Sequence, residues 1–89
     1  LTSRMVPSLE RAAGPANVTV QKAVTGAEDF AFYQEKVPGL FVFLGGMPKG
    51  TNPATTAPHH TAGFFVDESG LTLGVRTLAT LALDYLNGK

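Results

Sequence analysis

The sequence predicts an α/β fold in the order strand, helix, strand, loop, helix. Residues 17–23 alternate apolar and polar side chains with the period of a half-buried strand. Residues 40–44 are five consecutive apolar side chains, which is typical of a strand covered on both faces. Near both ends of the chain, apolar residues instead recur with a helical period. If the two strands are parallel, their crossover connection should be right-handed.

The N-terminal segment is predicted to form a short amphipathic helix over residues 2–13. Its apolar positions share one helical face: Val6, Leu9, Ala12 and Ala13. Gly14-Pro15 should end this helix. Pro7 is compatible with a helix only in its first turn, so the helix should begin near Val6 or continue a longer helix. The strand over residues 17–23 follows and should end at Thr25-Gly26.

The middle of the chain should contain a helix over residues 27–36. Glu28-Asp29 stands where the positive end of a helix favours acidic side chains. Val37-Pro38-Gly39 then predicts a turn into the apolar strand. Residues 45–58 are rich in glycine and proline and predict a long loop, and loops of that length are usually functional or disordered.

The last helix has the clearest pattern. Asp67-Glu68-Ser69 provides residues suited to its N-cap, and Asn87-Gly88 provides its C-terminal stop. Its apolar residues are expected to share one buried face: Leu71, Val75, Leu78, Ala82, Tyr85 and Leu86.

Composition excludes several classes of protein. Hydrophobic residues make up 44% of the chain and charged residues 16%, which excludes disorder as a description of the whole. Seven basic residues balance seven acidic ones, so nucleic acid is not an expected partner. Without cysteine, any metal would be bound by nitrogen and oxygen ligands. No apolar run is long enough for a membrane span, so we expect a soluble protein, and Leu1 suggests a piece of a longer chain.

His59-His60, at the end of the long loop, is the main candidate for chemistry. Neutral imidazole is a common ligand of zinc and similar ions, and a loop histidine can point into a cleft. Adjacent residues point in different directions, however, so on spacing alone two exposed loop imidazoles are favoured over a pair of metal ligands. Glu28-Asp29 could contribute acid–base chemistry or simply begin a helix, and Gly45-Gly46 could approach a substrate or simply end a strand.

Three segments taken together resemble a known family. They are residues 26–33, residues 38–45, and His60-Thr61-Ala62-Gly63-Phe64 followed by Val66-Asp67-Glu68. In this order they are similar to the C-terminal end of aminoacylase/carboxypeptidase-type metallohydrolases, in the amidohydrolase branch of hippurate hydrolases and indole-acetyl-amino-acid hydrolases.

The resemblance implies a zinc-aminopeptidase-like α/β/α sandwich interrupted by a lid domain. Residues 1–89 would be the C-terminal segment of the catalytic domain, with the lid and the N-terminal catalytic segment lying outside them. It also implies a dinuclear centre of divalent metal, zinc or manganese, that hydrolyses the amide bond of an N-acyl amino acid. A Glu upstream of this segment would be the general base, so no catalytic residue is expected here and the segment alone should be inactive.

The resemblance assigns roles to four residues. His60 would be a metal ligand, because Phe64 stands four residues later, as in the family pattern; Ala62 departs from that pattern, which commonly has proline. Glu28, Gly26 and His59 would contact substrate or support the metal ligand.

The remaining expectations concern partners. The segment should associate with the remainder of its parent chain and with a small N-acyl amino acid, in a cytoplasmic homo-oligomer that binds neither nucleic acid nor membrane. The alternative function is a non-catalytic α/β module that docks on a partner chain through its apolar strand and long helix, with solvated histidines.

Overall fold

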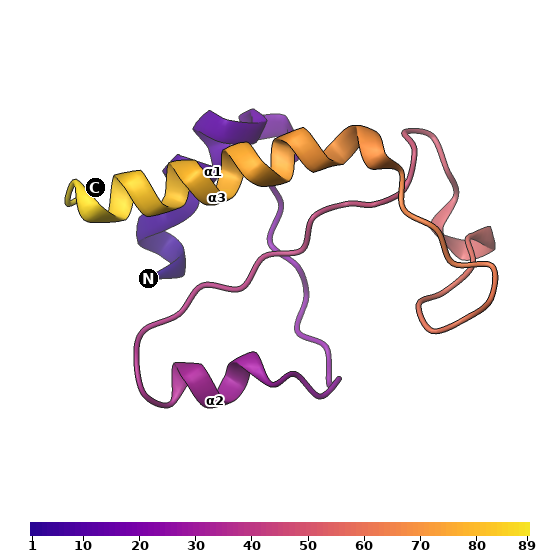
Figure 1. Cartoon of the computed structure of the whole chain (residues 1–89), viewed down its shortest axis with the longest axis horizontal. Helices are drawn as coiled ribbons and strands as arrows, with labels where there is room; N and C mark the ends of the chain where they lie inside the picture. Colours follow the sequence, from indigo (N-terminus) through magenta and orange to yellow (C-terminus); the bar gives the residue numbers. More distant parts are fainter.

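The computed structural model describes all 89 residues, which form helices joined by irregular segments without any β-strand (Figure 1). The α-helices are α1 (Thr2–Ala13), α2 (Phe30–Gln34) and α3 (Leu71–Leu86). Single 3-10 turns occur at η1 (Pro15–Asn17), η2 (Pro53–Thr55) and η3 (Glu68–Gly70). The predicted α/β fold, with its sandwich of strands and helices, is therefore wrong for this chain. None of the helices combines the length and the apolar character needed to span a membrane.

α1 has the predicted bounds, but Pro7 lies inside it rather than in its first turn. The expected start of the helix near Val6 is therefore wrong. Proline removes one backbone donor, whose acceptor would be the Ser3 carbonyl. Because Ser3 is exposed, water can satisfy that carbonyl. Gly14 ends the helix as predicted, with a φ of 88° that favours glycine.

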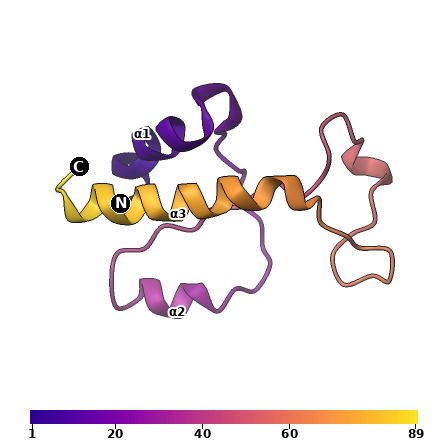
Figure 2. The ribbon, with the colours of Figure 1, turned by 45° about the horizontal axis from the view of Figure 1, so that its top comes forward.

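α1 packs against α3, although residues 14–70 separate them in the sequence (Figure 2). The buried apolar side chains are Met5 and Ala12. Ser8 and Asp84 are buried polar residues. The Arg11 guanidinium donates to both the Asp84 carboxylate and the Ser8 hydroxyl, so these buried polar groups are satisfied. An ion pair thus joins the two helices beside a small apolar core.

α3 presents to the rest of the chain a different face from the one its apolar pattern predicted. Its least exposed positions form one stripe: Leu73, Gly74, Thr77, Thr80, Leu81 and Asp84. The predicted face is exposed instead, with Val75 at 71%, Leu78 at 66% and Leu86 at 79%. At about 100° per residue, the two stripes lie on opposite sides of the helix. α3 thus carries apolar residues on both sides, although the less exposed stripe also includes Thr77, Thr80 and Asp84.

The two predicted strands are extended segments that pair with nothing. Residues 18–21 and 40–45 both line an open groove of about 680 Å³ that also borders α1 and α3. A β-ladder would require the two backbones to run about 4.8 Å apart. Residues 40–45 instead contact α3 through a side chain, because a Cβ at Gly74 would lie 2.9 Å from Leu44 Cδ2. Residues 40–44 are apolar, as a buried strand requires, but this chain has no neighbouring strand with which they could pair.

α2 is shorter than the helix predicted over residues 27–36. The Phe30 N–H donates to Glu28 Oε1 at 3.1 Å, so the Glu28 side chain satisfies one backbone donor at the start of α2, whose N-cap is Asp29. The Phe30 ring lies 5.4 Å from the Phe41 ring, which ties α2 to the extended segment that follows it. A Cβ at Gly39 would come within 2.9 Å of the Phe30 ring, so this close approach requires glycine.

The exposed surface is large for the size of the chain. It amounts to 7326 Å², whereas a folded monomer of 9.3 kDa is expected to expose roughly 5,000 Å². The excess is about three times the area that one partner buries in a standard protein interface, roughly 800 Å². The excess surface is therefore large enough to form more than one standard interface.

Candidate functional site

Both histidines lie on a tight loop of residues 57–64, here called the histidine loop, at the end of the molecule away from the chain termini (Figure 1). Thr61 Oγ1 donates to the Pro58 carbonyl at 2.7 Å, and the Phe64 N–H donates to the Thr61 carbonyl at 3.1 Å. Gly63 approaches Ala57 so closely that a Cβ at position 63 would lie 3.2 Å from Ala57 Cβ. The loop is therefore closed by contacts among its own residues.

His60 is the only non-glycine residue of the chain with a positive φ, at 64°. This left-handed conformation costs an ordinary L-residue about 1–2 kcal/mol. Histidine adopts it more often than most residues, and it persists where the surrounding structure imposes it. The loop thus fixes the backbone of His60. Because His60 is exposed, its side chain remains accessible.

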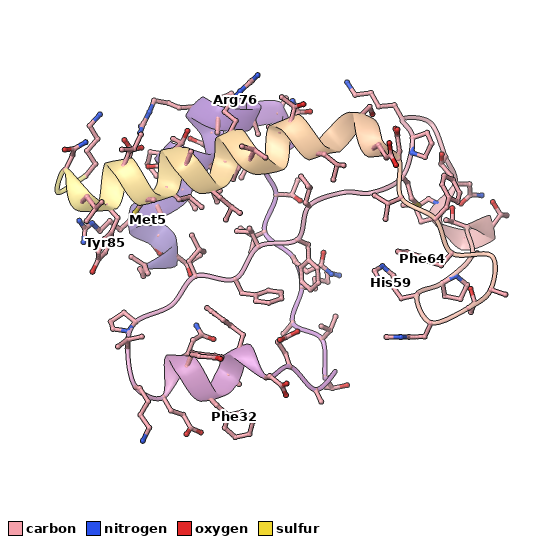
Figure 3. The ribbon with its side chains drawn as sticks, viewed as in Figure 1. Met5, Phe32, His59, Phe64, Arg76 and Tyr85 are labelled. Carbon is pink, nitrogen blue, oxygen red and sulfur yellow. The ribbon has the colours of Figure 1, made fainter.

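His59 has different surroundings from its neighbour. Its ring packs on the Phe64 ring, with centroids 4.5 Å apart and planes inclined by 38° (Figure 3). The His60 ring centroid lies 6.5 Å from that of His59. His59 also lines a hollow of about 410 Å³, whereas His60 does not. One imidazole is thus stacked within the loop, and the other is not.

The hollow beside His59 has a mostly apolar wall and one carboxylate, that of Asp67. The Ser69 hydroxyl donates to Asp67 Oδ2 at 2.8 Å, and the Ser69 N–H donates to Oδ1 at 3.1 Å. These hydrogen bonds, the hydroxyl's first, lower the pKa of Asp67. Asp67 is therefore ionised at neutral pH. It caps the 3-10 turn η3 that leads into α3, whereas the N-cap of α3 itself is Gly70 and not one of the predicted residues 67–69.

The chain does not bring Glu28 and Gly26 to the histidine loop, since neither lines the hollow. The exposed Glu28 carboxylate accepts from Phe30, and nothing lies within 4 Å of a Cβ position at Gly26. Gly45-Gly46 does border the hollow, and the Gly46 carbonyl accepts from the Asp67 N–H at 2.8 Å.

Several curated proteins that match the chain are hydrolases. IAA-amino acid hydrolase ILR1-like 6 of Arabidopsis thaliana is 37% identical over 76 residues, which is 85% of this chain. Thermostable carboxypeptidase 2 of Saccharolobus solfataricus is 36% identical over 81% of the chain. N-acetylcysteine deacetylase of Bacillus subtilis is 48% identical over 65% of it. The chain belongs to this amidohydrolase family.

The amidohydrolase chain spans a small part of these relatives, namely 16%, 18% and 13% of their respective lengths. No protein-family model matches its sequence. No solved structure matches it either. The relationship therefore rests on sequence identity along one segment of each relative.

Within the amidohydrolase chain, no three His, Cys, Asp or Glu side chains form a group that could hold a metal ion. Sequence reasoning singled out both histidines but missed the packing of His59 on Phe64. The available signal was two aromatic rings five residues apart, with Ala62-Gly63 between them to allow a tight turn.

Proposed function

We propose that this chain forms part of a metal-dependent amidohydrolase that cleaves the amide bond of N-acyl amino acids, with His60 as one metal ligand. The observation that carries the proposal is the left-handed backbone of His60 in an otherwise ordinary loop. Such conformations cluster at functional sites, where the surrounding structure holds them. The names of two relatives, an IAA-amino acid hydrolase and an N-acetylcysteine deacetylase, support the substrate class.

The residues of the loop fit the contribution of a single ligand. An exposed neutral imidazole suits zinc, manganese and similar divalent ions. The other ligands and the general base would come from parts of the enzyme outside these residues. When bound, divalent cations activate water and polarise the scissile carbonyl. The part of this chain is to hold the His60 imidazole in place.

The exposed apolar surface supports membership in a larger assembly. The outer face of α3 is exposed at Val75, Leu78 and Leu86, although these side chains gain most from burial. The excess area is too large for one standard interface. The remainder of the parent chain would cover it. A non-catalytic docking module would use the same surface, and the two functions differ in whether His60 binds metal.

Substitution of His60 in the complete hydrolase tests the proposal. His60→Asn retains a residue that adopts positive φ and removes the imidazole. We expect metal affinity and hydrolysis of an N-acyl amino acid to fall by more than about 100-fold, because losing a ligand costs more than losing a group that supports one. Metal content is measured by elemental analysis, and the rate by release of the free amino acid.

Lys49→Ala is the matched control, since Lys49 is exposed on the loop that precedes the histidines. It should leave metal content and rate unchanged. Full metal content together with an unchanged rate in His60→Asn would contradict the assignment of His60 as a ligand.

A further inference from the structure

We infer that His59 is a positioning residue for His60, acting through the packing of its ring on Phe64. The inference rests on the proposed function, because the residue it positions is the proposed metal ligand. It gives the supporting role expected of His59 a physical basis, the packing of its ring on Phe64, and requires no contact between His59 and the metal. The argument depends on how the histidine loop is closed.

The His59–Phe64 contact closes the loop around His60. Ring centroids 4.5 Å apart are at the near end of the range for packed aromatic side chains. One ring directly precedes His60 and the other follows it by four residues. The contact therefore restrains the chain on both sides of His60, and Figure 3 shows the two labelled rings lying together at the loop.

The backbone of the loop needs this restraint. Positions 62 and 63 are alanine and glycine, so no proline stiffens the segment and glycine adds freedom. The other side-chain contact that closes the loop is the Thr61 hydroxyl on the Pro58 carbonyl. Because His60 has an unfavourable φ of 64°, a loosened loop would let it relax to more ordinary conformations.

Relaxation of His60 would weaken metal binding without removing the ligand. A ligand must be held in the productive geometry, and supporting groups typically contribute 10- to 100-fold to metal affinity. A competing explanation is that His59 is itself a ligand. The two explanations differ in what the ring of residue 59 must offer, because packing needs only an aromatic ring, whereas ligation needs a nitrogen.

The test compares His59→Ala with His59→Phe in the complete hydrolase. We expect His59→Ala to weaken divalent-metal binding about 10- to 100-fold, and His59→Phe to stay within about threefold of the parent. Affinity is measured with cobalt(II) against a chelator, followed by the absorption of the bound ion, and needs no activity assay. Phe64→Leu should behave like His59→Ala, since it keeps an apolar side chain and removes the ring.

Each outcome of this comparison either supports or overturns the inference. Unchanged affinity in His59→Ala or in Phe64→Leu overturns the inference. So does an equal loss in His59→Phe and His59→Ala, which would make residue 59 a ligand. His59→Phe is informative even if the alanine variant fails to fold, because a folded protein with weakened binding contradicts the inference. Failure of the proposed function would be seen in a separate measurement, if the His60→Asn protein retained its metal.

Discussion

In the α1–α3 pair, contacts join residues far apart in the sequence, whereas the histidine loop is closed by contacts between near neighbours. Arg11 and Asp84, which bridge the helices, are 73 positions apart. In the loop, the Thr61 hydroxyl reaches Pro58 across three positions. The helix pair therefore depends on the fold of the whole chain, but the loop can set the backbone of His60 with few buried contacts. Substitutions in the α1–α3 pair should therefore leave the histidine loop intact, and substitutions in the loop should leave the helix pair intact.

Met5→Ala should have the largest effect and should act on the helix pair. Met5 is buried at 2% exposure, and truncating such a side chain typically lowers the free energy of unfolding by about 2–5 kcal/mol. Urea unfolding followed by circular dichroism measures the change. Val20→Ala is the control and should change little, because Val20 is 92% exposed. Loss of the His59–Phe64 contact in Met5→Ala, seen by NMR, would show that the loop is not independent.

Gly63→Ala should have an intermediate effect, confined to the histidine loop. The added methyl would lie 3.2 Å from Ala57 Cβ, so the loop must open or shift. We expect overpacking to cost about 1 kcal/mol and to weaken the His59–Phe64 contact measured by NMR. Ala57→Gly in the same protein removes the opposing methyl and should restore that contact. A Gly63→Ala protein whose ring contact is intact would contradict this account.

Ser69→Ala should have the smallest effect, on the turn between the two regions. The folded-state pKa of Asp67 is lowered, so its contribution to stability is present above the unfolded value of about 3.9 and is lost as pH falls through the folded value. Without the Ser69 hydroxyl, the pKa of Asp67 should rise toward its usual value. An NMR titration of the Asp67 carboxyl carbon measures this, with Glu68→Gln as a control that keeps the hydrogen bonds. An unchanged pKa in Ser69→Ala would exclude the hydroxyl as the cause.

Elements that depend on local signals were predicted correctly. α1 and α3 have helical apolar periods, and the C-terminal stop is confirmed by Gly88, whose φ is 77°. The prediction of two strands was wrong because a strand needs a neighbouring strand to pair with, and a local sequence pattern cannot show whether one is present. Phe43, within the apolar run, is 70% exposed.

The buried face of α3 could not be read from its own sequence. Both sides of this helix carry apolar residues, so periodicity offers two candidate faces. The burial of Asp84 depends on Arg11, at the other end of the chain. In the site, the sequence was enough to place both histidines on a loop. It did not predict the strained φ of His60, because this φ arises from the closure of the loop.

The distance in sequence between α1 and α3 also has a consequence for how the chain acquires its shape during synthesis. Bringing the two helices together closes a loop of residues 14–70, at an entropic cost of about 3–4 kcal/mol. A ribosome makes α1 first and α3 last, so Met5 cannot reach its core until translation of this stretch is nearly complete. The histidine loop, whose contacts are local, can form as soon as it leaves the exit tunnel.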